Sequence, residues 1–328
     1  MNTNTSAANF RNALPQGMCR LPDWGLLQAT GAEARKFLHG QLTQDVEHLQ
    51  PTAARLAGYC SAKGRLLATL LVWSGDEDSV WLAGSADLLP ATLKRLSMFV
   101  MRAKCKLSDA SAQRPMWGLA GPVVASRWSA AVGLPVWGRC TLAEGDLIRL
   151  PDAVHGGLAW PRYLLVSAVL GDSALADAAF AGLPSLDQGD WDWLEVMSGV
   201  PRICLATQEQ FVPQMVNLEL VGGVNFQKGC YPGQEVVARS QYRGTTKRRA
   251  QVMTSTAPLQ PAQEIFHSDD AEQPAGRVIL AGSSFAQGHA ALVEVRLAAL
   301  ESGTLSVGAV GGPVLQLAPL PYALLLPE

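Results

Sequence analysis

The pattern of apolar and turn-forming residues changes near Thr245, and this change constrains the fold more than any other feature of the sequence. Before that point, segments with apolar residues at helical spacing, such as "AEARKFLHGQLTQDV" (32–46), alternate with short apolar strands. Beyond Lys247, short apolar stretches such as "GRVILAG" and "AALVEVRL" alternate with Gly, Pro and Ser turns. That second pattern is typical of a small β-barrel or sandwich. We therefore expect a mixed α and β region followed by an all-β domain over 246–328.

The mixed region predicts helices and strands in alternation. "DWGLLQATG" (23–31) predicts a strand, 32–46 a helix, and "RLAGYCSAKGRLLATLLVW" (55–73) two strands about a turn at Lys63 and Gly64. Further segments are predicted to be helical at 85–101, 173–183 and 191–200, extended at 105–110 and 115–121, and mostly irregular at 200–225.

Length and composition bound the class of protein. A chain of 328 residues is longer than a single hydrophobic core usually reaches, so two or three domains are expected. The net charge of -2 predicts no general affinity for nucleic acid or acidic membranes. The apolar runs are too short to span a bilayer, and residues 1–17 form a polar, flexible lead without a signal-peptide core. We expect a cytoplasmic monomer.

The six cysteines are scattered, with no CxxC pair and no Cys/His cluster at metal-ligand spacing. Neither a disulfide framework nor a metal site is therefore expected. Five of the cysteines have the context of small core residues. Cys230 differs, because it lies in "FQKGCYPGQEVVAR" between a lysine, two glycines and a proline.

The surroundings of Cys230 predict a reactive thiol. Pro232 suits the first position of a helix that Gly244 would end, so Cys230 lies just before a helix N-terminus. Unsatisfied amides, the helix dipole and the positive charge of Lys228 all favour the thiolate. The alternative is a structural cysteine packed under a turn.

A basic run follows the predicted helix. It contains Arg239, Arg243, Lys247, Arg248 and Arg249, with no acidic residue among them. Such a run suits a polyanion, either phosphate or a chain of carboxylates. The alternative is a solvated helix face followed by a polar entry into a strand.

The same stretch carries a resemblance. "KGCYPGQEVVAR" (228–239) resembles the K-G-C-Y-x-G-Q-E signature of the YgfZ folate-binding family, relatives of the glycine-cleavage T-protein that act in iron-sulphur cluster maintenance. The likeness extends to 30–46, to "AKGRL" (62–66), to 211–235 and to "PLPYALLLPE" at the C-terminal end. It covers nearly the whole chain from about Leu21.

The resemblance implies an α+β fold in which two α/β, ferredoxin-like lobes over 18–245 form a folate-binding core around a central hole. A C-terminal β-barrel over 246–328 completes it. The implied cofactor is tetrahydrofolate or a derivative, including polyglutamylated forms.

Two tryptophans match positions associated with folate binding in the family, Trp24 and Trp191. An indole face holds a flat pterin or aminobenzoyl ring well. Trp193 competes with Trp191 in the same segment, and each could instead be a core aromatic. The signature further implies catalytic roles for Lys228 and Cys230, and cofactor contacts at Tyr231, Gln234, Glu235 and Arg239.

Two departures from the pattern bear on activity. T-protein relatives carry acidic residues where this chain has Ala68 and Thr69, and aminomethyl transfer to folate needs a carboxylate near the reacting nitrogen. The related helix usually ends with a glutamate two residues before its glycine, where this chain has Met197, with Glu195 nearby. A different acceptor would then hold the pterin, or folate would bind more weakly.

The resemblance therefore implies a tetrahydrofolate-binding factor that supports iron-sulphur cluster assembly or repair, including for enzymes that modify tRNA. Its partners would be iron-sulphur enzymes or assembly factors. The alternative is a folate-dependent aminomethyltransferase. A third hypothesis is direct tRNA binding through the basic run, although no recognisable RNA-binding module accompanies it.

Overall fold

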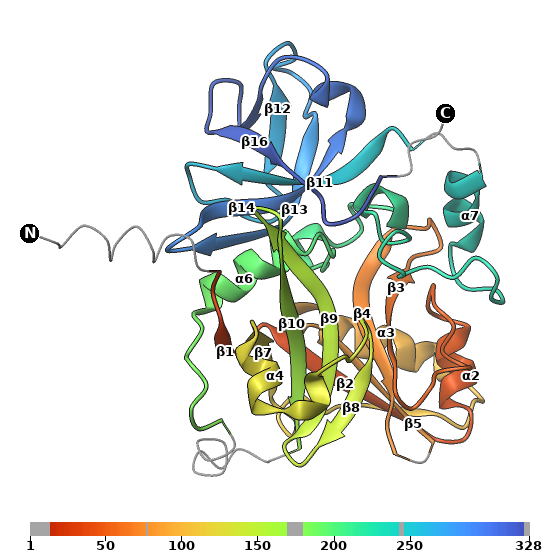
Figure 1. The fold of residues 1–328 in the computed structure, drawn as a ribbon. Coiled ribbons are helices and arrows are strands. Elements are labelled where there is room, and N and C mark those ends of the chain that lie inside the picture. Colours follow the sequence, from red (N-terminus) through yellow and green to blue (C-terminus); the bar gives the residue numbers. More distant parts are fainter. Residues whose placement is uncertain (1–13, 77, 169–179, 243–245, 325–328) are drawn as a thin grey trace, which may run out of the picture.

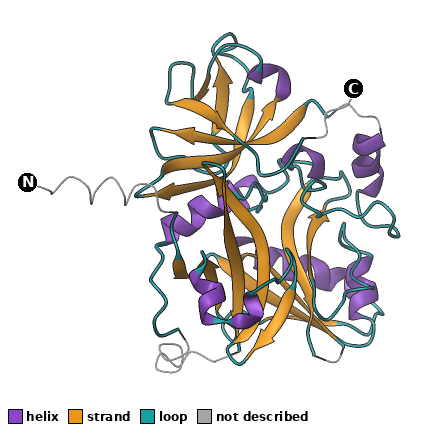
Figure 2. Ribbon diagram, viewed as in Figure 1, coloured by secondary structure: helices purple, strands orange, loops and turns teal. Residues whose placement is uncertain are grey.

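The computed structural model describes residues 14–76, 78–168, 180–242 and 246–324. Two five-stranded antiparallel sheets form the lower part of the molecule, and a closed six-stranded barrel forms the upper part (Figure 1). Helices lie on the outer faces of the sheets and between the lower part and the barrel (Figure 2). The predicted α+β class, with two lobes and a C-terminal β-barrel, is confirmed.

The sheet of the first lobe has the strand order β3-β4-β5-β2-β6. Its strand β4 is buried on both faces, as its continuous apolar sequence "LLATLLVWS" requires. Two helices accompany this sheet, the second preceded by a 3₁₀ turn. The elements are β2 (Trp24–Thr30), α2 (Ala34–His39), β3 (Ala54–Cys60), β4 (Leu66–Ser74), β5 (Ser79–Ser85), η1 (Ala86–Leu88), α3 (Leu89–Val100) and β6 (Lys106–Asp109).

The sheet of the second lobe has the order β1-β7-β10-β9-β8. Its two longest strands form a hairpin that turns at Gly156 and Gly157, where both φ angles are positive (57° and 80°). The elements are β1 (Gly17–Arg20), β7 (Met116–Ala120), α4 (Val123–Arg127), η2 (Ser129–Ala131), β8 (Arg139–Leu142), β9 (Gly145–His155) and β10 (Leu158–Ser167).

Helix α6 (Gln188–Met197) joins the second lobe to the barrel. A Cβ atom on Gly282 would lie 2.2 Å from the backbone nitrogen of Trp193, so the helix and the barrel approach at backbone distance. The C-terminal segment adds a further tie, because the Tyr322 hydroxyl donates to the carbonyl of Gly199 at 2.8 Å. Barrel and lobes are thus packed against each other around α6.

The closed barrel has the strand order β11-β14-β13-β12-β15-β16. Its elements are β11 (Arg248–Ser255), β12 (Glu264–His267), β13 (Gly276–Ser284), β14 (Gly288–Arg296), η5 (Leu297–Leu300), β15 (Leu305–Val307) and β16 (Val314–Ala318). Between α6 and the barrel the chain is mostly irregular, as predicted for 200–225, with η3 (Leu205–Thr207), η4 (Pro213–Val216) and then α7 (Gln234–Tyr242).

The prediction of a helix over 32–46 is wrong beyond His39. The Thr43 amide donates to the Gly58 carbonyl at 2.9 Å, and the Thr43 hydroxyl accepts from the Gly58 amide at 2.7 Å. The segment therefore pairs with β3 once the short helix ends, and Leu42 is buried in that pairing. Tertiary contacts override the helical spacing of the apolar residues.

The predicted N-terminal lead can be compared with the structure in part. Gly17, the last residue of the predicted lead, already belongs to β1. Most of the helix predicted at 173–183 lies outside the described residues, as do residues 243–245 at the predicted domain boundary. None of the helices in the described ranges has the length and apolar character that crossing a membrane requires.

Candidate functional site

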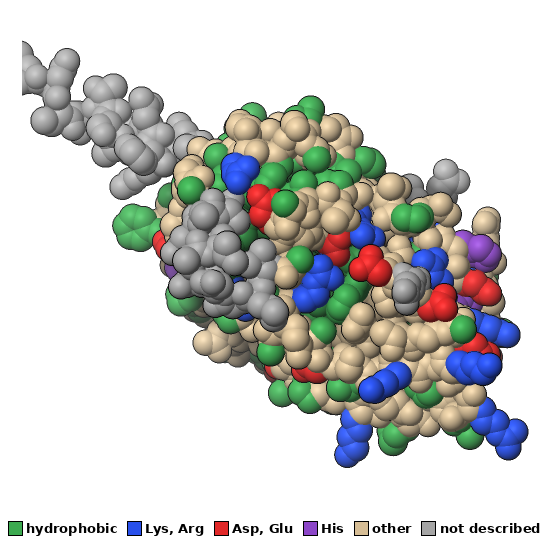
Figure 3. All heavy atoms as spheres, turned by 90° about the horizontal axis from the view of Figure 1, so that it is seen from below, with side chains coloured by type: hydrophobic (Ala, Val, Ile, Leu, Met, Phe, Trp, Pro, Cys, Tyr) green, Lys and Arg blue, Asp and Glu red, His purple; other side chains and the backbone are tan. Residues whose placement is uncertain are grey.

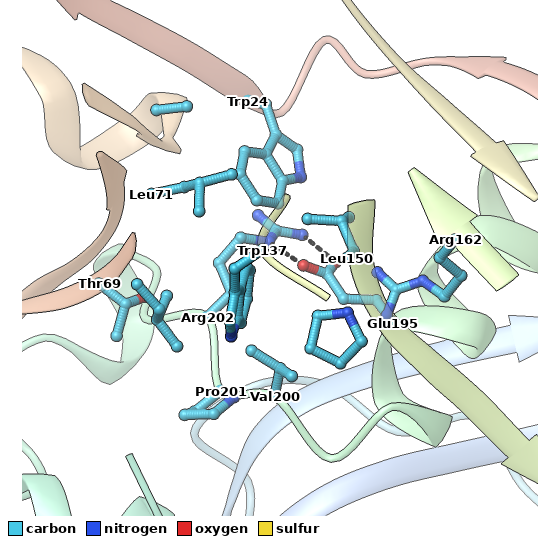
Figure 4. A pocket seen from close by; sticks show the side chains of 13 residues that line it. Trp24, Thr69, Leu71, Trp137, Leu150, Arg162, Glu195, Val200, Pro201 and Arg202 are labelled. Atoms are coloured by element: carbon cyan, nitrogen blue, oxygen red, sulfur yellow. Dashed lines mark hydrogen bonds and ion pairs between the residues drawn. The ribbon is translucent and has the colours of Figure 1, made fainter. Parts of the chain in front are cut away.

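A cavity lies between the two lobes, at the place where the resemblance implies a hole. Strands β2, β3, β4 and β5 line one side, and β9, β10, α6 and the segment after α6 line the other. The thirteen lining residues are Trp24, Leu56, Thr69, Leu71, Ala83, Trp137, Leu150, Pro151, Arg162, Glu195, Val200, Pro201 and Arg202 (Figure 4).

A buried ion pair organises one wall of the cavity. The guanidinium of Arg202 donates to both carboxylate oxygens of Glu195, at 2.8 and 2.9 Å, and to Asp23 at 2.8 Å. Although burial alone would lower the pKa of Arg202, the charge of Glu195 and its hydrogen bonds raise it above the ordinary value. This fork-to-fork geometry fixes both side chains in place.

Trp24, one of the two tryptophans that the resemblance associates with folate, lines the cavity. It is partly exposed and lies at the start of β2, with the Arg202 guanidinium 5.2 Å from its ring centroid. Its indole Nε1 is buried and has no hydrogen-bond partner among the described residues. The ring therefore offers the cavity an apolar face and an unused donor.

Trp191, the second of these tryptophans, lies in the protein core. Its side chain has no solvent exposure, and it is not among the residues that line the cavity. The Arg162 guanidinium lies 4.8 Å from its ring centroid, and a Cβ on Gly118 would lie 2.5 Å from ring atoms. Trp193 is also buried and contacts His155 edge-on. Neither tryptophan lines the cavity in this structure.

The second tryptophan of the cavity is Trp137, which sequence reasoning missed. It lies in the irregular segment between η2 and β8, with a positive φ of 64°. Arg162 and Arg202 were missed as well, while Glu195 and Thr69 were noticed only as departures from the family pattern. A positive φ leaves no sequence signal unless the residue is Gly or Asn, so nothing in "LPVWGR" marked Trp137.

The residues of the KGCY signature meet at a different place, on the turn before α7. Cys230 is exposed, whereas Cys19 and Cys60 are buried and the other three are intermediate. A Cβ on Gly233, where φ is 79°, would lie 2.4 Å from the carbonyl oxygen of Ser61. The signature therefore packs directly on the β3–β4 turn, and glycine is required there. The exposure of Cys230 and the presence of a helix after it agree with the prediction, but α7 begins at Gln234 and not at Pro232.

Lys228 is held beneath this turn. Its Nζ donates to the carbonyls of His39 at 2.6 Å and Gly229 at 3.1 Å, and lies 4.8 Å from the ring centroid of Tyr231. Burial lowers the pKa of Lys228 to about 8, against the opposing charges of Asp45 and Cys230. The turn therefore carries a positive charge that is lost just above neutral pH.

An aspartate with two histidines lies next to Lys228. Asp45 contacts His39 Nδ1 and His48 Nδ1, each at 3.0 Å. Burial would raise the pKa of Asp45, but hydrogen bonds from His48 and the charge of Arg55 lower it to about 2. The opposite side of the His39 ring approaches the signature, since a Cβ on Gly229 would lie 3.6 Å from Nε2.

The other predicted cofactor contacts also lie at this turn or on α7. Tyr231 is buried, which raises its pKa, and the Gln234 amide donates to the Gly229 carbonyl at 3.5 Å. Glu235 and Arg239 are exposed. None of the predicted residues from Lys228 to Arg239 lines the cavity. The structure thus brings the signature residues together but separates them from Trp24.

The basic run is partly internal. Arg248 pairs with Glu294, and the buried Arg249 pairs with Glu219, so these two arginines stabilise the barrel and its junction. Lys247 is exposed, and Arg243 lies outside the described residues. On the face seen from below, acidic and basic side chains lie near one another (Figure 3). The solvated-surface interpretation suits Arg239 and Lys247, which are both exposed.

Comparison with known proteins finds a relative that is similar over nearly the whole sequence. No family model matches the chain. It is 32% identical over 326 residues to the tRNA-modifying protein YgfZ of Edwardsiella ictaluri (strain 93-146), a match that covers 94% of this chain and 93% of that protein. The structure is similar to that of the glycine cleavage system aminomethyltransferase T from Bartonella henselae, with a TM-score of 0.72, 16% identity, and 94% and 86% of the two chains covered. The second likeness concerns the fold alone.

Proposed function

The chain belongs to the YgfZ family, and from this premise we propose that it binds tetrahydrofolate and supports iron-sulphur cluster assembly or repair. The relative with 32% identity is named for tRNA modification. We accordingly propose that the clients include iron-sulphur enzymes that modify tRNA. In this proposal the cavity binds folate, and Cys230 on its turn is the reacting group.

The observation that carries the proposal is the composition of the cavity. Trp24 and Trp137 offer flat apolar surface beside the Glu195–Arg202 pair. Planar ligands bind in such sites, where aromatic walls supply contact area and a few polar groups set orientation. Each carboxylate oxygen of Glu195 accepts one bond from Arg202 and keeps a second lone pair. Glu195 would serve as the acceptor that Met197 cannot be.

Cys230 would act from outside the cavity. Its exposure allows it to meet a partner protein or a small thiol. We propose that Cys230 handles a thiol, iron or one-carbon adduct for the client.

The alternative, a folate-dependent aminomethyltransferase, has less support. A transfer of this kind needs a carboxylate near the reacting nitrogen. Among the described residues that line the cavity, the acid is Glu195, and both its oxygens are bonded to Arg202. Ala68 and Thr69 stand where relatives carry acids. The fold of the aminomethyltransferase is therefore shared without a free base in the cavity.

Two measurements test the proposal. Titration with tetrahydrofolate should change the tryptophan fluorescence saturably, with one ligand per chain. In cells that lack their own factor, the wild-type chain should restore the activity of iron-sulphur enzymes, and Cys230→Ala should not, although it still binds folate. If the fluorescence does not change on titration, the folate site is refuted. If Cys230→Ala restores the enzyme activity fully, Cys230 is not needed for the function.

A further inference from the structure

The C-terminal end of helix α3 exposes a group of large apolar side chains. Met98 is 62% exposed, Phe99 47% and Met101 86%. No other stretch of four residues in the described part of the chain exposes three large apolar side chains. Single exposed apolar residues are normal on a protein surface, but a contiguous group of them marks an interaction surface.

The way α3 packs explains why this group faces outward. Leu89, Thr92 and Leu96 are its buried residues, and their spacing forms one face that packs on β2 and β6. Met98 comes from the opposite face of the helix. Met101 follows the helix with a positive φ of 43°, which is uncommon for a residue with a side chain of this size. The packing of α3 on its sheet is thus complete without the two methionines.

The same segment carries positive charge without counter-charge. Residues 94–106 contain five basic residues and no acidic one, although the whole chain has a net charge of -2. None of the five forms an ion pair with another residue that the structure describes. Two of them precede the apolar group in the chain and three follow it. These five, with Met98, Phe99 and Met101, form what we call the α3 patch: Lys94, Arg95, Arg102, Lys104 and Lys106.

Nucleic acid suits the α3 patch less well than a protein does. Single-stranded nucleic acid binds to basic grooves through aromatic rings that stack on its bases. The patch has one aromatic residue, Phe99, and the guanidinium of Arg95 already lies 5.8 Å from its ring centroid. The two methionines have no ring to stack, whereas methionine, aromatic residues and arginine are enriched at the centres of protein–protein interfaces.

A membrane surface also suits the patch less well. A helix that lies in a membrane surface buries its apolar face at the boundary of the acyl chains. The apolar face of α3 is already buried against its own sheet, so the end of the helix is what remains for a partner. A pocket on a protein can receive a few side chains of this kind, and carboxylates around the pocket can pair with the surrounding cations.

We propose that the α3 patch docks a protein partner whose surface has an apolar pocket rimmed by aspartate and glutamate. Met98, Phe99 and Met101 enter the pocket, and the five cations pair with the rim. Because attraction between exposed charges is screened by salt, the affinity falls as the ionic strength rises. The docking needs neither bound folate nor the Cys230 thiol, and so goes beyond the proposed function.

Photo-crosslinking in the native cells identifies the partner. The crosslinking amino acid p-benzoylphenylalanine replaces Phe99 in one full-length variant, and in the control it replaces Phe285, which is fully exposed at the turn between β13 and β14. A protein that is crosslinked from position 99 and not from position 285 is identified by mass spectrometry and purified. Its affinity for the wild-type chain is then measured at low and high salt.

Substitutions in the patch test the contacts with this purified partner. Met98→Ser with Met101→Ser should weaken binding about 10-fold or more, as expected for residues at the centre of an interface. Lys94→Glu with Lys104→Glu should also weaken it and should reduce its dependence on salt. Lys247→Glu makes the same charge change outside the patch and should leave the affinity unchanged. All three variants should unfold at the wild-type temperature, because the substituted side chains are exposed.

Several outcomes would overturn the proposal. If position 99 captures no protein that position 285 does not also capture, or captures a second copy of this chain alone, the patch has no such partner. If the substitutions at Met98, Met101, Lys94 and Lys104 leave the affinity unchanged, the partner binds elsewhere. If the wild type binds purified tRNA, or vesicles of phosphatidylethanolamine and phosphatidylglycerol, and the same substitutions abolish that binding, the patch recognises nucleic acid or a membrane and not a protein.

Discussion

The cavity and the Cys230 turn differ in how the chain builds them. Side chains from six strands and a helix meet in the cavity, and a buried ion pair holds one wall. The turn is one continuous segment, fixed by a glycine that packs on the Ser61 carbonyl and by a lysine bonded to backbone carbonyls. The first region is a cavity made by the topology, and the second is an exposed thiol presented by a local motif. If the proposed function is correct, binding and chemistry can therefore be disabled separately.

The largest predicted effect is a loss of stability when the ion pair in the cavity wall is broken. Arg202→Met leaves the buried Glu195 carboxylate unpaired and should lower the free energy of unfolding by about 3–5 kcal/mol in urea denaturation. The double variant Glu195→Gln with Arg202→Met should regain part of that loss. Arg239→Met, on the exposed face of α7, is the control and should change stability by less than about 0.5 kcal/mol. Equal effects of the two arginine substitutions would contradict a structural role of the ion pair.

A second prediction concerns the range from mildly acidic to neutral pH. Burial and the charge of Glu195 raise the pKa of Asp192, on α6, to about 7 from 3.8. The native state therefore holds a proton that the unfolded state releases above about pH 4. Its stabilising contribution is complete below the unfolded pKa and is lost as the pH rises through 7.

The free energy of unfolding should thus fall by about 3 kcal/mol between pH 5 and pH 8 on account of Asp192, because each pH unit between the unfolded and the native pKa changes it by about 1.4 kcal/mol. Asp192→Asn should flatten this part of the profile and be more stable than the wild type at pH 8. Asp269→Asn, in the barrel, is a matched control because Asp269 is exposed. A profile that keeps its slope in Asp192→Asn would show that another group titrates.

At the Cys230 turn, the free energy of unfolding should change with pH in the opposite direction, and at a higher pH. The pKa of Lys228 is lowered to about 8 from 10.5, so between these values the unfolded state binds a proton that the native state does not. Its contribution to stability therefore increases as the pH rises through this window. Lys228→Met should remove that increase, by a smaller amount than the change at Asp192 because Lys228 is only half-buried. Lys36→Met, on α2, should not alter the profile.

The sequence predicted the turn better than the cavity, for a physical reason. The glycines, the lysine and the proline that shape the Cys230 turn lie within six residues, so local rules for helix starts and turns apply to them. The exposure of Cys230 and the strands about Lys63 and Gly64 followed from such rules. The C-terminal barrel was also predictable, because alternation of apolar strands and turns repeats over its whole length.

The cavity depends on contacts that no local pattern encodes. Arg162, Arg202 and Trp137 become neighbours only when the two lobes pack. The side of α6 that faces the cavity could not be inferred, because the helix is buried over most of its surface and its tryptophans look alike in sequence. The prediction of a helix over 32–46 was wrong beyond His39 for a similar reason, because the pairing of Thr43 with β3 is a tertiary contact.

The central claim is that folate binds in the cavity and that Cys230 acts apart from it. The most direct test compares tetrahydrofolate affinity in Trp24→Ala and Cys230→Ala by fluorescence titration. Trp24→Ala should weaken binding by about 1–3 kcal/mol, the value of a stacked aromatic contact, while Cys230→Ala should stay within about 0.5 kcal/mol of the wild type. Unchanged affinity in Trp24→Ala together with lost affinity in Cys230→Ala would contradict the account and place the folate at the turn.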